Sequence, residues 1–168
     1  MADFNMSTRF INPASGDVLV FNGTSFVAEA PSIPSAQQLK HVTVTLSSPQ
    51  ILVLHTTPVE LIAAQGAGKS ISVVRVTAAV TAGTPYAGGS NVLVYYTTSG
   101  SALGALGIAL SSTFLTTAVD NHAVLVPGTT GTGGTGQDLR NQSISVSCVT
   151  PFTTGTGTLS YNFWYVVN

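Results

Sequence analysis

The sequence predicts an all-β fold: an antiparallel β-sandwich of jelly-roll-like design, preceded by an extended N-terminal arm. Three observations predict it. Several runs alternate apolar and polar residues with a period of two, and β-branched residues are common in them. Glycine, serine and threonine interrupt these runs about every dozen residues, and no long helical pattern appears. We therefore expect the arm over residues 1–38 and the sandwich over residues 39–168.

Three runs alternate strictly, so each is predicted to bury one face of a strand. In chain order, their apolar faces are Val42, Val44 and Leu46; Ile144, Val146 and Cys148; and Leu159, Tyr161, Phe163, Tyr165 and Val167. Ser160, Asn162 and Trp164 fall on the opposite face of the last run. The runs "QILVLH", "SVVRV" and "NVLVYY" are more continuously apolar, which predicts strands covered on both sides.

Two segments between these runs do not show the alternation. Residues 101–117 are rich in alanine and leucine, which favours a short helix, but three nearby glycines disfavour a long one. The stretch "PGTTGTGGTGQDL" from Pro127 is typical of a long loop.

The N-terminal arm contains "GDVLVFNGTSFV", which predicts two short strands joined by a tight type I′ turn at Asn22-Gly23. Pro31 and Pro34 then predict an extended link. A two-stranded hairpin is not stable alone, so it must pack on its own sandwich or on another subunit. The residues expected to make that attachment are Phe10, Val18, Val20, Phe21, Asn22, Gly23 and Phe26.

The chain has little charge, and this limits what it can bind. Charged residues make up 7% of the 168 positions and the formal net charge is −1, far below the charge content of ordinary soluble domains. A basic groove for nucleic acid is therefore not expected. Neutral hydroxyl groups are cheaper to bury than charges, so the composition favours a subunit of a large assembly. The single cysteine excludes an intrachain disulfide, and no signal or membrane-spanning pattern is found, so synthesis in a cytoplasm is expected.

The stretch "QGAGKS", Gln65 to Ser70, resembles the second half of a phosphate-binding loop. The first glycine of that motif falls at position 63, which is Ala63, and the residues after Ser70 favour a strand rather than a helix. We therefore interpret the stretch as a hairpin-type turn with two glycines at positive φ, and Lys69 as its exposed charge.

No arrangement of residues predicts catalysis, a metal or a cofactor. The three histidines, His41, His55 and His122, lack the spacing of metal ligands. The carboxylates are scattered, and no nucleophile motif occurs. Arg75 alternates with apolar neighbours, so it is expected to be buried or at an interface; a buried arginine would need a partner such as Glu60 or a carbonyl group.

The aromatic residues of the predicted strands leave two interpretations open. Tyr95, Tyr96, Trp164 and Tyr165 are expected to form core or subunit interface, which is the commoner use of aromatics on strands. A sugar-binding platform is the alternative.

Two stretches carry a resemblance to known proteins. "GDVLVFNGTSFVAEAP" resembles a short repeat of phage tail fibres and other phage virion proteins, with Phe26 where tryptophan is usual. The body is similar to a group of small phage virion proteins whose pattern is a glycine-lysine turn followed by Y-x-G-G. Here these are Gly66-Ala67-Gly68-Lys69 and Tyr86-Ala87-Gly88-Gly89, and "GTGTLSYNFWYVV" resembles the closing strand of that group.

The resemblance implies a bacteriophage virion structural protein, and such modules occur as head decorations, head fibres and tail proteins. Among these we expect a decoration or cement protein on the capsid surface that stabilises the head. Its expected partners are itself, as a homotrimer, and the major capsid protein, with no nucleic acid or membrane. The alternative is a tail- or head-fibre adhesion module that binds a host-surface glycan.

Overall fold

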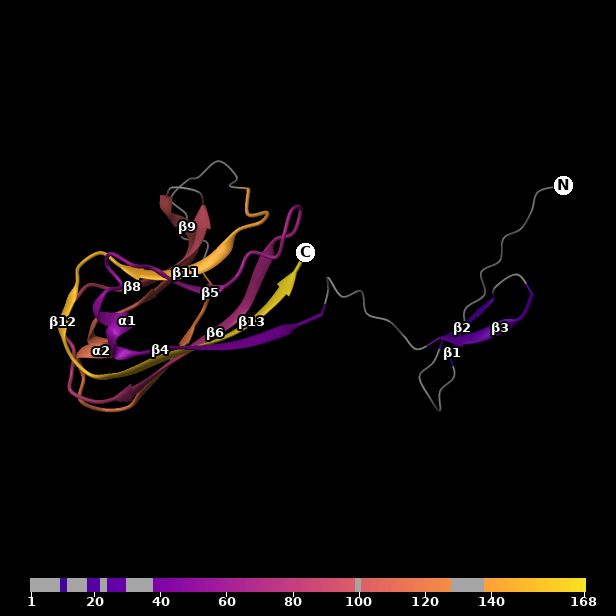
Figure 1. Cartoon of the computed structure of the whole chain (residues 1–168). Helices are drawn as coiled ribbons and strands as arrows, with labels where there is room; N and C mark the ends of the chain where they lie inside the picture. Colours follow the sequence, from indigo (N-terminus) through magenta and orange to yellow (C-terminus); the bar gives the residue numbers. More distant parts are fainter. Residues whose placement is uncertain (1–9, 12–17, 22–23, 30–37, 99–100, 128–137) are drawn as a thin grey trace. The chain divides into compact units, whose positions relative to one another are not determined.

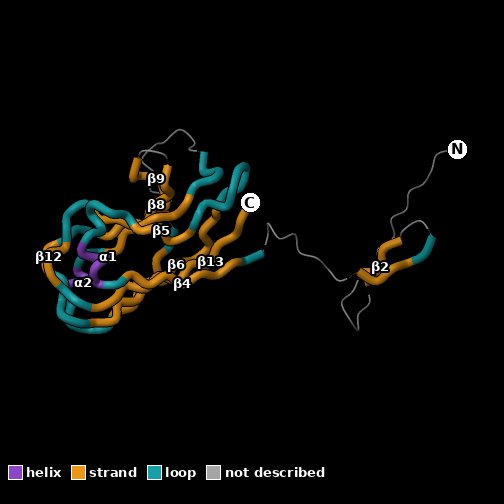
Figure 2. The backbone as a smooth tube through the Cα atoms, viewed as in Figure 1, coloured by secondary structure: helices purple, strands orange, loops and turns teal. Residues whose placement is uncertain are grey.

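The computed structural model describes residues 10–11, 18–21, 24–29, 38–98, 101–127 and 138–168. The chain separates into two compact units, Met1–Ser35 and Ala36–Asn168 (Figure 1). Both are built from antiparallel sheets, which confirms the predicted all-β fold. Strands dominate the second unit, called the body below, and its two short helices lie at one end (Figure 2).

The first unit contains a three-stranded antiparallel sheet in the order β1-β2-β3. The strands are β1 (Phe10–Ile11), β2 (Val18–Phe21) and β3 (Phe26–Glu29). The predicted pair β2 and β3 is present, but the two-residue turn is wrong, because Phe21 pairs with Phe26 and leaves residues 22–25 between the strands. Asn22 and Gly23 themselves lie outside the described residues. The expectation of only two strands is also wrong, since β1 pairs with β2.

The body contains two four-stranded antiparallel sheets, β10-β6-β13-β4 and β5-β11-β8-β9. Their strands are β4 (Lys40–Leu46), β5 (Val59–Ile62), β6 (Ile71–Ala82), β8 (Val92–Thr98), β9 (Ser101–Leu110), β10 (Asn121–Leu125), β11 (Ser143–Cys148) and β13 (Gly157–Val167). A two-stranded sheet pairs β12 (Phe152–Thr154) with β7 (Ala87–Gly88).

The pairing of the eight main strands is nested. The first, β4, pairs with the last, β13; β5 pairs with β11, β6 with β10, and β8 with β9. The remaining pairs, β13 with β6 and β11 with β8, join these couples into the two sheets. Apart from the consecutive strands β8 and β9, the paired strands are therefore far apart in the sequence.

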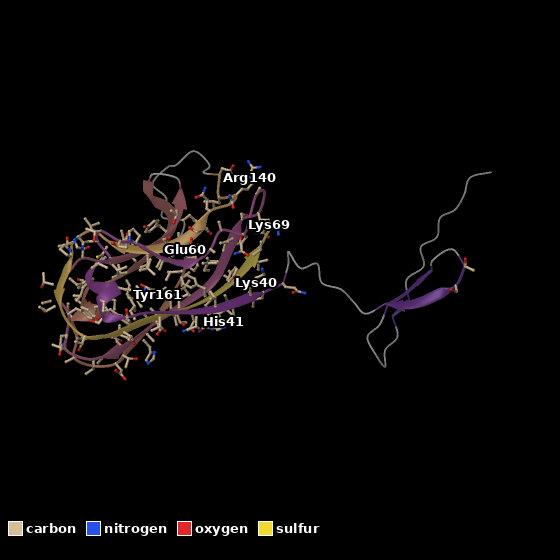
Figure 3. All side chains as sticks on the ribbon, in the orientation of Figure 1. Lys40, His41, Glu60, Lys69, Arg140 and Tyr161 are labelled. Atoms are coloured by element: carbon tan, nitrogen blue, oxygen red, sulfur yellow. The ribbon has the colours of Figure 1, made fainter. Side chains whose placement is uncertain are left out.

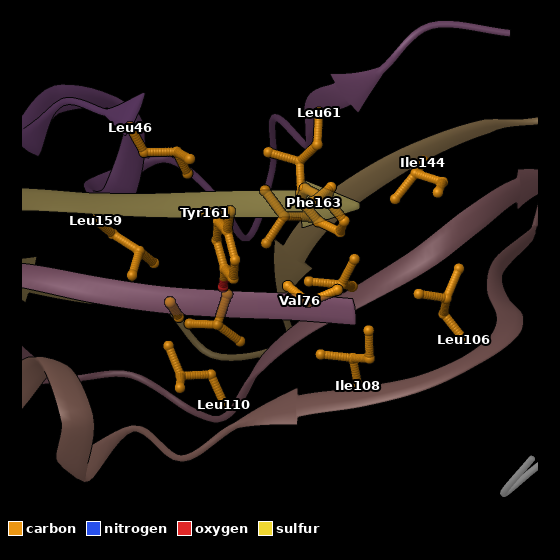
Figure 4. Packing of buried hydrophobic residues seen from close by; sticks show 14 of the residues in the cluster. Leu46, Leu61, Val76, Leu106, Ile108, Leu110, Ile144, Leu159, Tyr161 and Phe163 are labelled. Atoms are coloured by element: carbon orange, nitrogen blue, oxygen red, sulfur yellow. The ribbon is translucent and has the colours of Figure 1, made fainter. Parts of the chain in front are cut away.

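The inward residues of both sheets belong to one hydrophobic cluster (Figure 4). Leu159, Tyr161 and Phe163 on β13 are completely buried, as their alternation predicted. The alternations of β4 and β11 are confirmed too, and Cys148 is a buried free thiol. Each completely buried large side chain contributes about 2 kcal/mol through the removal of apolar surface from water, so this cluster is the main source of stability.

One side-chain hydrogen bond joins the two sheets through the core. The hydroxyl of Tyr96 on β8 donates to the carbonyl oxygen of Ile71 on β6 at 2.5 Å. Burial raises the pKa of Tyr96, because the phenolate cannot be solvated there. This bond fixes how the two sheets meet, which apolar packing alone specifies only loosely.

The strand predicted for "QILVLH" is wrong, because this segment begins as a helix, α1 (Ser48–Leu52). Gln50 Oε1 accepts hydrogen bonds from the backbone N–H and the hydroxyl of Ser47, both at 2.9 Å. Pro49 lies in the first turn, where its missing N–H costs nothing. The Ser-x-x-Gln capping pattern therefore outweighs the β propensity of the apolar residues that follow.

The ambiguous segment 101–117 divides into strand and helix. Residues 101–110 form β9, and a single helical turn, α2 (Thr113–Thr116), follows and buries Phe114 and Leu115. Most of the predicted glycine-threonine loop, residues 128–137, lies outside the described residues.

The stretch "QGAGKS" is a turn, as predicted, but it is not a hairpin. Gly66 and Gly68 have φ of +98° and +76°, and Lys69 N–H donates to Gly66 O at 3.2 Å. The flanking strands β5 and β6 pair with different neighbours, so the turn links the two sheets. Lys69 is exposed, as expected.

The Tyr86-Ala87-Gly88-Gly89 stretch closes the body at the end that holds the helices. The ring of Tyr86 meets Phe152 edge-on with centroids 5.7 Å apart, and its hydroxyl donates to Gly157 O at 3.2 Å. Gly89 has φ of +81°, and a Cβ there would lie 2.1 Å from Phe152 Cε1. The second glycine therefore gives the Phe152 ring the space it occupies.

Gly89→Ala should lower the free energy of unfolding by about 2–4 kcal/mol, because backbone strain and a clash with a buried ring act together. Gly66→Ala is the matched control: its φ is also positive, but nothing lies within 4 Å of the added Cβ, so about 1 kcal/mol is expected. Chemical denaturation measures both. Equal losses in the two variants would show that Phe152 does not determine the residue at position 89.

Tyr161→Phe should raise the free energy of unfolding by about 1 kcal/mol. The hydroxyl of Tyr161 is buried without a hydrogen-bond partner in the described part of the chain, and burial raises the pKa of this phenol. Tyr96→Phe removes the bond to Ile71 and should lower stability by about the same amount. Urea denaturation of both variants tests the opposite signs; a loss of stability in both contradicts the assignment.

Candidate functional site

Three of the four aromatic residues expected in the core or at a subunit interface are nearly buried in the folded chain. The exposed fractions of Tyr95, Tyr96 and Tyr165 are 5%, 6% and 9%. Tyr96 and Tyr165 belong to the core cluster, and Tyr95 lies outside it. Trp164 is half-buried and alternates with the core residues of β13. The structure therefore does not bring the four rings together, either as one interface or as one platform.

The predicted attachment residues of the first unit lie in its three strands where they are described. In the register of this sheet, Phe10 lies opposite Leu19, Val18 opposite Glu29, Val20 opposite Val27, and Phe21 opposite Phe26. Asn22 and Gly23 are outside the described residues. The sheet thus brings Phe21 and Phe26 to opposite positions on neighbouring strands.

The sheet β10-β6-β13-β4 carries a second set of side chains that alternates with its core residues, and we call it the outer face. The register aligns these residues in rows across the strands. The outer face includes His41, Thr43, Thr45, Arg75, Thr77, Ala79, Thr81, His122, Val124, Ser160, Asn162 and Trp164. Arg75 is the only one with a formal charge, so the surface is polar and nearly neutral.

One row of the outer face packs Trp164 between two neighbours. Arg75 on β6 lies over the indole with its Cζ 5.2 Å from the ring centroid, and the ring of His41 on β4 lies 4.8 Å away at 35°. These two strands flank β13, so a neighbour covers each side of the indole. The expectation of a buried Arg75 paired with Glu60 or a carbonyl group is wrong: Arg75 is exposed, and its partner is Trp164.

Within each of the next two rows, side-chain hydrogen bonds join neighbouring strands. The hydroxyl of Thr43 donates to Asn162 Oδ1 at 2.7 Å, and Asn162 Nδ2 donates to Thr77 Oγ1 at 3.3 Å. The hydroxyls of Thr45 and Ser160 are 2.8 Å apart. The hydrogen bonds from Thr43 through Asn162 to Thr77 form a series across three strands in which each residue donates to the next. The series ends at the Thr77 hydroxyl, whose own proton has no acceptor among the described residues.

A hollow of about 350 Å³ opens on the outer face beside this series. It is lined by Thr77, Ala78, Ala79, His122, Ala123, Val124 and Asn162. Ala79 stands between His122 on β10 and Ser160 on β13 in the same row. Its short side chain between longer neighbours creates the hollow.

The exposed cations of the body lie elsewhere. Lys40, Lys69 and Arg140 project near its C terminus (Figure 3). Arg140 forms an exposed ion pair with Asp138 at 2.8 Å, and this guanidinium lowers the pKa of the Asp138 carboxyl to about 2. None of the charged residues of the described surface lines the hollow, although Arg75 and Asp120 lie two positions from the lining residues Thr77 and His122.

The sequence predicted the polarity of this face but not its contacts. The alternation had already placed Trp164 and Asn162 opposite the core. Thr77, Ala79 and His122 were not predicted, because the hollow exists only once β6 lies between β10 and β13. The one available signal was the pair of small residues Ala78 and Ala79 within a strand rich in β-branched residues.

The described residues contain no cluster of three or more histidine, cysteine or acidic side chains that could hold a metal ion. No described helix is long and apolar enough to cross a bilayer. Comparisons with protein-family models, curated proteins and solved structures found no match. The function proposed below therefore rests on the residues of this chain.

Proposed function

We propose that this chain is a structural protein of a bacteriophage virion, made in the host bacterial cytoplasm, which decorates the capsid and stabilises the head. The nested strand pairing carries the proposal. Pairing of first with last, second with seventh, third with sixth and fourth with fifth strands supports a jelly-roll sandwich for the body. Viral coat domains commonly use this architecture.

Lectins and cupins also have the jelly-roll architecture, so the fold alone does not identify a virion protein. Properties of the surface supply further support. The outer face carries neutral hydroxyl and amide groups that are already bonded to one another. A neighbouring subunit can therefore cover the part of this face around Thr43, Thr45 and Ser160 with little loss of hydration free energy, whereas charged groups would lose much more. This chemistry suits a subunit that contacts its neighbours in an assembly.

The two motifs that resemble phage virion proteins both lie in turns where the backbone or the packing limits which residues fit. The glycines of Gly66-Ala67-Gly68-Lys69 have positive φ in the turn that links the two sheets. Tyr86 and Gly89 of the second motif both pack against Phe152. The motif residues thus occupy positions where this fold restricts the choice of residue.

The attachment role belongs to the first unit in this proposal. This unit has a sheet of its own, which consists of short strands. Because these strands have only two to four residues each, the sheet buries little apolar surface, and packing on a partner would add stability. The proposed partner is the major capsid protein, with residues 1–38 acting as an extended arm.

The body is proposed to form a homotrimer, because a trimer matches the three-fold positions of an icosahedral shell. Sedimentation equilibrium of the full chain should therefore give three times the 17.2 kDa chain mass. A monomer at micromolar concentration would contradict self-association of the free protein.

Deleting residues 1–38 should abolish binding to virus heads while the body still folds. The core cluster lies in the body, so thermal unfolding of the truncated chain should remain cooperative. Heads from a phage lacking this gene are mixed with the full or the truncated chain, sedimented, and assayed for bound protein.

Two results would overturn this assignment. An unfolded truncated chain would mean that residues 1–38 belong to the core. Equal binding of both chains to heads would place the attachment surface on the body. Binding of the full chain to isolated tails but not to heads would favour the alternative, a fibre or adhesion module.

A further inference from the structure

We propose that the hollow on the outer face binds one neutral sugar residue of a glycan. The inference concerns a site on the body and does not depend on which part of a virion carries the chain. It rests on the shape of the hollow, on its hydrogen-bonding groups and on its lack of charge.

The hollow has a defined shape because the sheet around it is regular. The pairing of β10 with β6 is unbroken from Asn121 to Leu125, and that of β6 with β13 is unbroken around Ala79. His122 and Val124 form one wall of the hollow, Asn162 lies on the opposite side, and Ala79 forms the floor. A volume of about 350 Å³ is at the small end of ligand sites, which suits one ring rather than an extended chain.

The polar groups at the hollow are oriented before any ligand arrives. Asn162 is held on one side by Thr43 and donates to Thr77 on the other. The Thr77 hydroxyl therefore accepts from within the sheet, and its proton remains free to donate to a ligand. The His122 ring has no hydrogen-bond partner among the described residues and offers both a donor and an acceptor.

The remaining lining is apolar, which matches the carbon face of a sugar ring. The Val124 side chain is 64% exposed, and the methyl group of Ala79 forms the floor. A sugar presents hydroxyls at its edge and C–H groups on its faces. One orientation can therefore place hydroxyls near Thr77 and His122 and C–H groups against Val124.

The absence of charge selects against other ligand classes. None of the lining residues is an acid, a lysine or an arginine. Arg75, in the adjacent row, lies over the indole of Trp164. Phosphate, carboxylate and amine ligands would therefore lose hydration without a countercharge in the lining, whereas a neutral sugar exchanges water hydrogen bonds for protein ones.

The indole of Trp164 is not the sugar platform, because Arg75 and His41 already cover its two sides. A ligand of one ring in an open hollow should bind with a Kd of about 1–10 mM. Such affinity becomes effective when many copies of the site engage one glycan-coated surface together.

The test uses the full chain labelled with ¹⁵N and titrated with the methyl glycosides of glucose, galactose, mannose and N-acetylglucosamine. At least one of them should shift the amide signals of Thr77, Ala79, His122 and Val124. Ala79→Leu, which fills the hollow, should weaken binding at least about tenfold. His122→Ala, at an exposed side chain on an edge strand, should weaken it several-fold.

Thr81→Leu is the control, because it places the same leucine side chain on the same strand and face but outside the residues that line the hollow. It should bind as the unsubstituted chain does. The proposal is overturned if no glycoside shifts these amides at about 100 mM, if the shifts lie on another surface, or if Ala79→Leu binds unchanged while folded.

Discussion

The register of β13 is the constraint on which both the core and the outer face depend. This strand pairs with β4 on one side and with β6 on the other. Its alternate residues supply Tyr161 and Phe163 to the core and Asn162 and Trp164 to the outer face. A slip of one residue would exchange the two sets, burying an amide and exposing two large rings. Packing of the core therefore also positions the polar series that ends at Thr77.

Much of the fold could be predicted because alternation is a local signal. The buried faces of β4, β11 and β13 followed from the sequence alone, and so did the glycine turn before β6. Other features depend on particular local or distant contacts. Helix α1 was missed because Ser47 and Gln50 cap an apolar run that otherwise favours a strand. Thr43 and Asn162 are 119 positions apart, so the series they begin could not be read from spacing.

The candidate site was the least predictable part for the same reason. Aromatic residues drew attention in the sequence, yet Tyr96 and Tyr165 are used in the core and Trp164 is covered by its neighbours. The hollow arises from a small residue, Ala79, whose neighbours come from strands on either side. The two proposals use separate surfaces: the first unit attaches the chain, and the hollow on the outer face of the body meets sugars. The sugar proposal follows from a surface whose polarity comes from hydroxyl and amide groups rather than charges.

The central proposal, that the chain is built into virus particles, is tested most directly by quantitative mass spectrometry of particles released by bacteria that carry this gene. After purification on a density gradient, we expect the chain in a constant ratio to the major capsid protein across fractions and preparations. Its absence from intact particles, together with abundance in the soluble lysate, would contradict the account.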